Sequence, residues 1–448
     1  MIETLLHYNI NAPRYTSYPP ANLFRKAENE LEVKELWIAS NALGSSNLSF
    51  YFHIPFCSKR CLFCGCTSET IKEDSYREEY MQAIAKEMDK KLLWIDSSRV
   101  VTQVHFGGGT PTSVPVCDLK FILDRLKEKF TFSAGAEIAI ECNPASVTKE
   151  LLSELALAGF NRISYGIQDF NLETLRIIGR DPSLIDVPSL VSLSHELGFH
   201  SVNLDLIYGL PGQTLESFSE SVSKAIESKP DRIALFSYAH VPWKRPEQKH
   251  LESFVIPDAY HKMSFFLKAR EMFREANYQS IGMDHFVIPT DSLYLAAKEG
   301  LLHRNFQGYC TRSTTGQVYA FGSSAISQLD NAYLQNTHVT SDYIDKVKHE
   351  EMTEVRVHPL TETEKIWRNI IERLMCNNAL KINEIEKKVL GSRWDRLCAL
   401  EKEGLLEKIA DNEIRTTELG SLVIRYLVSV IDPLLENQKT EGVFSKTI

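Results

Sequence analysis

From residue 48 to residue 276 the sequence alternates between short β-rich runs and longer amphipathic segments. The β-rich runs, which predict strands, are Leu48–Ile54, Thr102–Phe106, Glu137–Glu141, Arg162–Gln168, Ser201–Tyr208 and Arg232–Tyr238. The amphipathic segments, which predict helices, are Tyr76–Leu93, Val116–Phe130, Lys149–Ala158, Val187–Leu197, Leu215–Ile226 and Tyr260–Ala276. This repeat predicts an α/β fold with parallel strands and crossover helices. The six units fall short of the eight that close a barrel, so we expect a partial (β/α)6 barrel with an opening for a large ligand.

Four cysteines, Cys57, Cys61, Cys64 and Cys66, lie within ten residues directly after the first predicted strand. The first three follow the pattern C-x₃-C-x₂-C. Three thiolates can hold three irons of a four-iron cluster and leave the fourth iron open to a small molecule, whereas four ligands saturate the cluster. A structural zinc ion is the alternative, but such sites usually draw their ligands from two separated pairs. No second Cys or His pair lies nearby, so the spacing favours an iron–sulfur cluster.

Polar or glycine-rich residues follow each of the other predicted strands. They are Gly107-Gly108-Gly109-Thr110-Pro111, Glu141, Gln168-Asp169, Tyr208-Gly209-Leu210-Pro211 and Tyr238-Ala239-His240, in chain order. The carboxyl ends of strands carry the active site in α/β folds. We therefore expect these residues and the cysteine run to converge on one rim.

The composition narrows the range of partners. A net charge of −9 over 448 residues argues against nucleic acid as the main partner, because phosphate binding needs a basic surface. Residues 1–17 lack the apolar core of a secretory signal, and no apolar run reaches the length of a membrane span. We therefore expect a cytoplasmic protein without membrane contact.

The barrel has extensions on both sides. We expect residues 1–47 to form an extended, proline-stiffened arm followed by a helix at Val33–Asn41. The barrel takes up residues 48–280. Residues 281–358 contain two irregular polar–aromatic stretches that extend the ligand cavity, and residues 359–448 form a mainly helical, winged-helix-like domain.

The cysteine pattern after the first strand resembles the radical S-adenosylmethionine (SAM) superfamily, so the barrel is expected to be the TIM-like partial barrel of that type. Longer stretches resemble the family of oxygen-independent coproporphyrinogen III oxidases, essentially from end to end. They are Pro13–Pro19, Tyr51–Cys57, Cys64-Gly65-Cys66, Gly282–Phe286, His303–Tyr309 and Phe444-Ser445-Lys446. The resemblance implies oxidative decarboxylation of two propionates of coproporphyrinogen III to vinyl groups, without oxygen, by a 5′-deoxyadenosyl radical.

The resemblance also implies the cofactors and their residues. Cys57, Cys61 and Cys64 would ligate a 4Fe–4S cluster, with one SAM on the fourth iron and a second SAM beside it. The residues implied at the first SAM are Tyr51, Gly108, Glu141 and Ile326. Those implied at the second are Gly109, Thr110, Gln168, Arg180, Asp205 and Ala239, and Phe63 would lie near the SAM site. An electron donor of the flavodoxin or ferredoxin type and a monomeric state are implied as well.

The chemistry of the residues independently supports some of these assignments, but it leaves alternative roles for the same residues open. Glycines allow close backbone approach to a ligand, although a glycine run is often only a turn. Glu141 and Asp205 suit an ammonium group or ribose hydroxyls, although each carboxylate alone fits a helix cap. Arg180 can fork onto a carboxylate, although alone it fits a solvated surface charge. For Ile326 and Ala239 the resemblance is the sole reason.

Cys66 is surplus to the three-cysteine pattern. The resemblance implies that it serves catalysis without ligating the cluster, and the alternative is a small buried residue. The substrate would carry four propionates, so we expect local cations among Arg14, Lys59, Arg60, His303 and Arg304.

Three other functions remain open. A haem chaperone of the same superfamily is expected to lack the fourth cysteine and the N-terminal arm, both of which are present here. A haem-degrading radical SAM methyltransferase is harder to separate by sequence. A zinc-stabilised barrel without radical chemistry is the third alternative.

Overall fold

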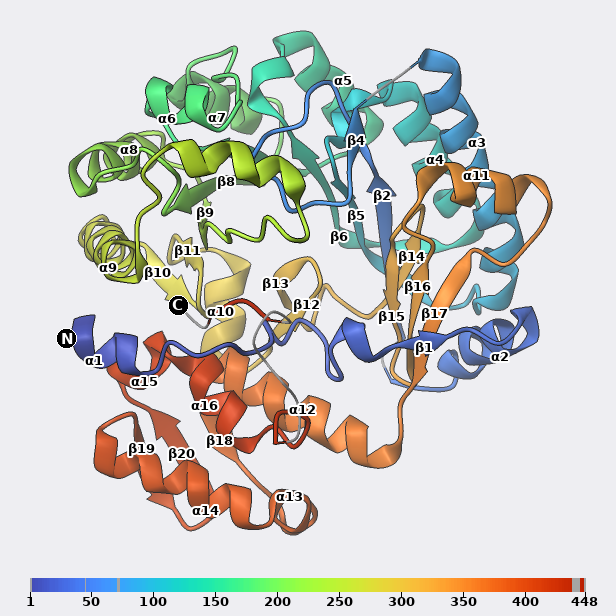
Figure 1. Cartoon of the computed structure of the whole chain (residues 1–448). Helices are drawn as coiled ribbons and strands as arrows, with labels where there is room; N and C mark the ends of the chain where they lie inside the picture. The colour runs from blue at the N-terminus through green and yellow to red at the C-terminus, as the bar shows by residue number, and fades with distance from the viewer. Residues whose placement is uncertain (1, 45, 71–72, 437–443, 447–448) are drawn as a thin grey trace.

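The structure is a computed structural model that describes residues 2–44, 46–70, 73–436 and 444–446. Its frame is a thirteen-stranded sheet in the order β1-β17-β16-β15-β14-β2-β5-β6-β7-β8-β9-β11-β10 (Figure 1). Seven neighbouring strands run parallel: β14 Gln317–Phe321, β2 Asn47–Ile54, β5 Val100–Gly108, β6 Thr131–Cys142, β7 Arg162–Gln168, β8 Ser201–Tyr208 and β9 Arg232–Ser237. The six predicted strands are confirmed, and β14 adds a seventh that arrives from far along the chain.

Helices cover the outer face of the parallel strands (Figure 1). They are α3 Asp74–Lys91, α4 Val116–Lys129, α5 Lys149–Ala158, α6 Leu172–Ile177, α7 Val187–Glu196, α8 Leu215–Glu227 and α9 Ala259–Glu275. All six predicted helices are present, and α6 is an addition. The fold is the open α/β barrel that the alternation predicts.

Side-chain alternation along the strands separates core from cavity. On β2, Phe50, Phe52 and Ile54 are fully buried in the core under the helices, and Phe52 stacks on Phe106 of β5 with ring centroids 4.9 Å apart. The residues between them, Tyr51 and His53, face the other side of the sheet. The interior of the barrel is consequently lined by polar side chains.

Antiparallel strands extend both edges of the sheet. They are β15 Ile326–Gln328, β16 Ala332–Asn336, β17 Glu354–Pro359 and β1 Arg25–Lys26 on one side, and β11 His285–Val287 and β10 Gln279–Ile281 on the other. A separate hairpin joins β12 Leu302–Asn305 to β13 Gly308–Thr311. The prediction that residues 281–286 and 303–309 are irregular is wrong, because each stretch belongs to a tight hairpin whose backbone groups are paired.

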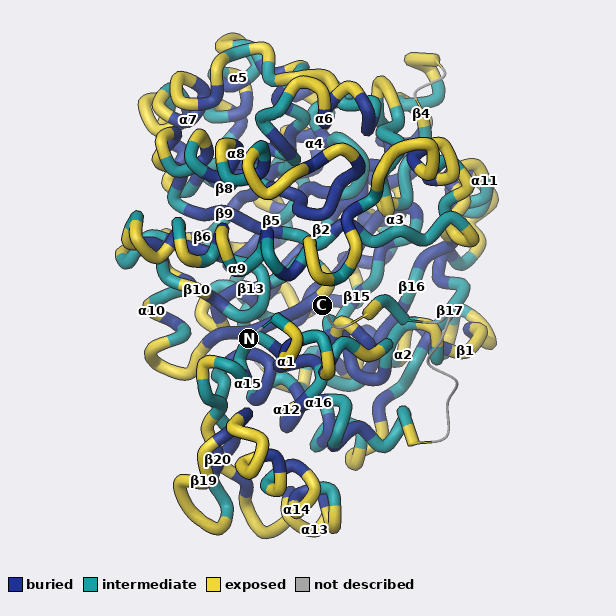
Figure 2. The backbone as a smooth tube through the Cα atoms, turned by 60° about the vertical axis from the view of Figure 1, so that its left-hand side comes forward, coloured by how far each residue is buried: buried dark blue, intermediate teal, exposed yellow. Residues whose placement is uncertain are grey.

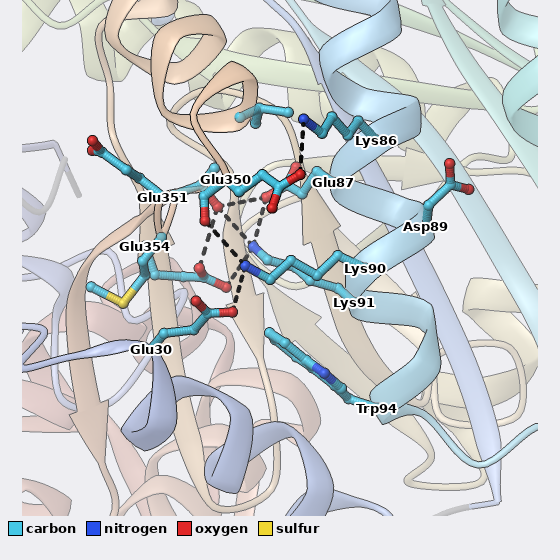
Figure 3. Close-up of a pocket in the computed structure, with 13 residues that line it drawn as sticks. Glu30, Lys86, Glu87, Asp89, Lys90, Lys91, Trp94, Glu350, Glu351 and Glu354 are labelled. Carbon is cyan, nitrogen blue, oxygen red and sulfur yellow. Dashed lines mark hydrogen bonds and ion pairs between the residues drawn. The ribbon is translucent and has the colours of Figure 1, made fainter.

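A buried charge network locks the added strands to α3 beside a cavity of ≈ 430 Å³ (Figure 3). Lys91 Nζ lies 2.6 Å from both Glu87 Oε1 and Glu354 Oε1. Glu87 Oε2 also accepts a hydrogen bond of 3.1 Å from the Gly322 backbone N–H, in the turn between β14 and β15. The network therefore fixes the end of β14 at the rim of the barrel. None of the predicted site residues lines this cavity.

The C-terminal part has its own hydrophobic core. It contains α12 Glu362–Asn377, α13 Glu384–Leu390, α14 Ser392–Ala399, α15 Glu418–Leu422 and α16 Ile424–Ile431, with a small sheet of β18 Ala379–Lys381, β20 Glu413–Thr416 and β19 Leu406–Ala410. Helices followed by a β19–β20 hairpin match the winged-helix-like pattern of the sequence.

The N-terminal arm runs between the barrel and the C-terminal helices (Figure 1). It begins with α1 Ile2–His7, which the sequence analysis did not foresee, and leads to α2 Glu30–Ser40, which it did. Tyr15 and Tyr18 donate to the carboxylate of Asp432 over 3.1 and 2.9 Å. The two ends of the chain meet, because Asn11 and Lys446 form a β-bridge (Figure 2 marks both ends).

The remaining helical elements are short. They are α10 Ser292–Lys298, α11 Thr340–Lys348, η1 Ala21–Leu23, η2 Leu92–Trp94, η3 Pro111–Ser113, η4 Pro144–Ser146, η5 Pro246–Ser253 and η6 Leu400–Glu403. Among the described residues, no helix is both long and apolar enough to cross a membrane.

Candidate functional site

The cysteine loop leaves the end of β2 and lies between two short parallel strands, β3 Phe56–Cys57 and β4 Glu69–Thr70. Cys57, Cys61 and Cys64 are free and partly exposed, and Cys66 is free and exposed. The loop is anchored to the end of α6 by a 3.0 Å hydrogen bond from the Leu62 N–H to the Ile178 carbonyl. The three predicted ligands therefore stand on one short segment at the barrel rim.

Polar groups surround the thiols. Thr110 Oγ1 lies 3.6 Å from Cys57 Sγ, and Arg180 Nη1 lies 3.6 Å from Cys61 Sγ. The Cys66 N–H points at Cys64 Sγ over 3.4 Å. Hydrogen bonding from Cys66 lowers the pKa of Cys64 to about 6, against the opposing effect of burial. Because a thiolate is the ligand form of cysteine, this environment favours metal binding.

The donor set fits an iron–sulfur cluster better than a single ion. Among the residues that the structure describes, no three His, Cys, Asp or Glu side chains converge closely enough to hold one metal ion. The thiols of Cys57, Cys61 and Cys64 nevertheless lie within electrostatic reach of one another, since Cys61 and Cys64 both raise the pKa of Cys57, after burial. Three cysteines on one short loop are the ligand pattern of a four-iron cluster with one open iron, whereas structural zinc sites usually draw on two separated pairs.

The segment around η5 clamps the cysteine loop through hydrogen bonds from Gln248 and Arg245. The buried Gln248 donates from Nε2 to the carbonyls of Phe63 (3.0 Å) and Ala239 (3.2 Å), and its Oε1 accepts from the Val241 N–H (2.6 Å). Arg245 Nη2 donates to the Gly65 carbonyl over 2.6 Å. Gln248 thus ties two predicted cofactor-binding residues, Phe63 and Ala239, together.

The glycine run after β5 packs against the chain itself. The Gly109 N–H donates to the Ile54 carbonyl and the Thr110 N–H to the Phe56 carbonyl, each over 2.8 Å. A Cβ on Gly109 would lie 2.7 Å from the Phe56 carbonyl oxygen. Gly108 has a φ of +120°, which side chains avoid. The run is therefore required for close backbone approach between β5 and β3, which brings Thr110 to Cys57.

Glu141 connects the ends of β5 and β6. Its Oε1 lies 2.9 Å from His105 Nε2, and its Oε2 accepts from the Gly108 N–H over 3.2 Å. Tyr51 stacks on His105 with ring centroids 5.8 Å apart, and its hydroxyl lies 3.1 Å from His53 Nδ1. The sequence analysis missed His53, which lies two residues from Tyr51 on β2, and His105 of β5, which pairs with Tyr51 across the strands.

Gln168 ends β7, Asp205 lies within β8, and Arg180 follows α6. Asp205 accepts from Asn203 Nδ2 over 2.7 Å and from Ser164 Oγ over 3.2 Å. Burial, and then repulsion by Glu141, raise its pKa to about 6. Gln168 has a φ of +71°, and Arg180 Nη2 donates to the Gly166 carbonyl over 2.5 Å.

Phe63, Ala239 and Ile326 complete the predicted set. Phe63 packs against the apolar cluster that contains Tyr238, and Gln248 binds its carbonyl. The register of β14 with β15 pairs Val318 with Gln328, which puts Ile326 beside the carboxyl end of β14. The structure thus brings the predicted residues to one rim, at the carboxyl ends of the parallel strands.

Comparisons with known proteins bear on the same region and on the whole chain. The family model of the radical SAM superfamily matches residues 51–225. The oxygen-independent coproporphyrinogen III oxidase of Synechocystis is 36% identical over 460 residues, covering 100% of this chain and 97% of that protein. The Escherichia coli protein of the same name is 36% identical over 98% of this chain and 97% of its own. The chain belongs to the family of oxygen-independent coproporphyrinogen III oxidases.

The solved structures agree with this membership. The structure of coproporphyrinogen III oxidase (HemN) from Escherichia coli, described as a radical SAM enzyme, superposes with a TM-score of 0.87 at 35% identity and covers 94% of this chain and 98% of that chain. Membership of the radical SAM superfamily implies a four-iron cluster and SAM as cofactors. Membership of the coproporphyrinogen III oxidase family makes the chain a radical SAM oxidoreductase.

The predicted cations of this oxidase-family chain fall into two groups. Lys59 pairs with Asp181 (3.3 Å), Arg60 pairs with Glu247 (2.9 Å), and His303 pairs with Glu372. Arg14 and Arg304 instead lie near the contact region between the N-terminal arm and the barrel, which we call the seam. That seam contains a cation that the sequence analysis missed, Arg425 of α16.

Proposed function

We propose that this protein converts coproporphyrinogen III to protoporphyrinogen IX without oxygen. Each of two propionates would lose CO₂, one hydrogen atom and one electron and become a vinyl group. The observation that carries this proposal is the similarity over the full length, from the arm to the tail, to relatives named oxygen-independent coproporphyrinogen III oxidase. A match confined to the barrel would support the radical chemistry alone.

The cluster and SAM, when bound, supply the radical that abstracts hydrogen from a propionate β-carbon. Cys57, Cys61 and Cys64 would hold the cluster. The clamp by Gln248 would keep the loop in register with the barrel, and the hydrophobic surface around Phe63 would exclude water from it. Two reacting propionates fit the proposal that two SAM molecules bind side by side.

The rim residues would hold the SAM molecules. Tyr51, Gly108, Glu141 and Ile326 would contact the first, and a carboxylate beside a glycine backbone suits a methionyl ammonium group. The second would lie against Gly109, Thr110, Gln168, Arg180, Asp205 and Ala239. Cys66, which hydrogen bonds with a ligand thiol, is assigned a catalytic role beside the substrate. Residues 281–358 would shape the substrate cavity.

Reducing power would come from a flavodoxin- or ferredoxin-like protein, and the enzyme would act as a monomer. Anaerobic reconstitution of the cluster, followed by addition of dithionite, SAM, coproporphyrinogen III and cell extract, tests the function. Formation of protoporphyrinogen IX together with 5′-deoxyadenosine is expected. Methylated or ring-opened tetrapyrrole, or tight haem binding without turnover, would refute the proposal in favour of a methyltransferase or a haem carrier.

The Cys66→Ser variant separates catalysis from ligation. We expect it to keep the visible absorbance of the cluster and to lose turnover. The Cys64→Ser variant is the matched control, because it removes a proposed ligand two residues away and should lose the cluster. Loss of the cluster in both variants would make Cys66 a ligand and overturn its assigned role.

A further inference from the structure

Three arginines from distant parts of the sequence lie near one another, since Arg425 binds the carbonyl of Pro13, next to Arg14, and both Arg14 and Arg304 lower the pKa of Arg425. Arg14 lies in the arm, Arg304 in β12 and Arg425 in α16. Figure 1 shows the arm passing between the β12–β13 hairpin and α16, on the other side of the barrel from α6 and β4, which flank the cysteine loop. We call these three residues the seam arginines.

Arg425 holds the arm and the tail together. It donates from Nε to the Pro13 carbonyl over 3.0 Å, from Nη1 to the Lys446 carbonyl over 2.6 Å, and from Nη2 to the Ala12 carbonyl. Each of these acceptors is a neutral peptide oxygen. These hydrogen bonds therefore satisfy the donors of Arg425, but they bring no negative charge to balance its positive charge.

Arg304 is nearly buried and lacks acceptors. Its side chain lies over the Tyr309 ring, 4.5 Å from the centroid, and the residue is 6% exposed. Its Nε and Nη1 atoms have no hydrogen-bond partner. In the same hairpin the Nδ2 atom of Asn305 and the Nε2 atom of Gln307 are also buried without a partner. Unpaired buried donors are rare, because each loses its hydrogen bonds to water without replacing them.

The charges at the seam do not balance. Asp284 faces the arginines, and although burial alone raises its pKa, His285, Arg304 and Arg14 lower it to about 2. Asp284 already accepts from His285 Nδ1 over 2.7 Å. Burial and then the proximity of Arg14 lower the pKa of Arg425 to about 9. The buried Arg304 and Arg425 and the exposed Arg14 thus share one carboxylate among the described residues, and buried charges are normally paired.

We propose that Arg14 and Arg304 form a receptor for carboxylates of the substrate, at the seam between the arm, the β12–β13 hairpin and α16. This inference rests on the function proposed above. An anion carrying at least two carboxylates would accept from the free nitrogens of Arg304 and offset the repulsion among the seam arginines. Arg425 contributes positive charge and keeps Arg14 of the arm in place.

The position of the receptor suits a reaction in which only two of the four propionates of the substrate are decarboxylated. Two of the four propionates stay in the product. A tetrapyrrole bound through these two can direct the other two toward the cysteine loop, across the barrel. Because hydrogen bonds from Tyr15, Tyr18 and Arg425 already hold the arm, Arg14 is in position before the substrate binds.

Equilibrium binding of coproporphyrin III tests this without catalysis. Coproporphyrin III is the stable oxidised form with the same four propionates, and its binding to the cluster-loaded enzyme is followed by fluorescence. We expect Arg14→Met and Arg304→Met each to weaken binding about tenfold or more. The matched control is Arg415→Met, which removes an exposed arginine on β20 of the C-terminal sheet and should leave the affinity unchanged. The tetramethyl ester, which lacks the charges, should bind the wild type and both seam variants alike.

The outcomes separate this inference from the proposed function. If Arg14→Met and Arg304→Met both bind coproporphyrin III within about twofold of the wild type, the receptor is refuted even when turnover is normal. Arg14 is exposed, so that variant is expected to fold whatever Arg304→Met does. If binding depends on the arginines but no protoporphyrinogen IX forms, the receptor stands and the proposed function fails.

Discussion

Replacing Gln248 by leucine should loosen the cysteine loop more than it weakens the rest of the protein. The change removes three hydrogen bonds and leaves the carbonyls of Phe63 and Ala239 and the N–H of Val241 without a partner. Leucine has nearly the volume of glutamine, so no large cavity forms. An unpaired buried group costs about 1–3 kcal/mol, and these groups are half-buried, so we expect a loss of about 3 kcal/mol.

The chain offers a close control in Gln317, which is equally buried. Its Nε2 donates to the carbonyls of Ser40 (2.8 Å) and Leu43 (3.1 Å), and its Oε1 accepts from the Asp330 N–H (2.9 Å). Gln317→Leu therefore deletes the same kinds of bond far from the cysteines. Both variants should lower the free energy of unfolding by similar amounts.

The assay that separates the two variants is the rate at which a chelator bleaches the reconstituted cluster. The bond from Gln248 to Phe63, which lies between the proposed ligands Cys61 and Cys64, should account for about 1–2 kcal/mol of local opening energy. That energy corresponds to a rate about five- to thirtyfold faster in Gln248→Leu, with little change in Gln317→Leu. Equal bleaching rates in the two variants would refute the idea that η5 clamps the loop.

Three further changes have defined outcomes. Gly109→Ala should abolish SAM binding, measured by equilibrium dialysis, because its Cβ meets a backbone carbonyl at 2.7 Å, whereas Gly135→Ala, with open space around it, should bind normally. Lys91→Met should lower the free energy of unfolding in urea by about 3–5 kcal/mol, because two buried carboxylates lose their counter-charge; a loss under about 1 kcal/mol would contradict this. Asp205→Asn should unfold at higher urea than the wild type at pH 7.5, because burial raises the pKa of Asp205 from 3.8 to about 6 and so penalises its ionised form. That advantage should shrink as the pH falls through about 6 toward 3.8, and an advantage that grows would reverse the assigned sign.

Sequence periodicity predicted the barrel because its signals are local. Each of the six predicted parallel strands carries a continuous β-rich run, and Arg162–Gln168 and Ser201–Tyr208 match β7 and β8 residue for residue. The sequence did not predict the strands from β14 to β17, because they are three to six residues long and pair across long sequence distances. Residues 281–286 and 303–309 looked irregular because a short hairpin has too few residues to show alternation.

The site residues also fall into those that sequence patterns predict and those that only the fold reveals. The cysteine spacing and the strand-end residues are patterns, so sequence alone located them. His53 was within reach, since a period of two puts it on the same face of its strand as Tyr51. His105 was not, because only the register between strands puts it beside Tyr51. Gln248 and Arg425 gave no signal, because a lone glutamine or arginine acquires its role from carbonyls that are brought near only by the fold.

Spectroscopy of the reconstituted protein under nitrogen tests the central claim, that one short loop holds a cluster with an open iron. We expect about four irons and four sulfides per chain, and an electron paramagnetic resonance spectrum of the reduced cluster that changes when SAM is added. Serine in place of Cys57, Cys61 or Cys64 should abolish that signal. A spectrum indifferent to SAM, or zinc bound at the three thiols, would contradict the account.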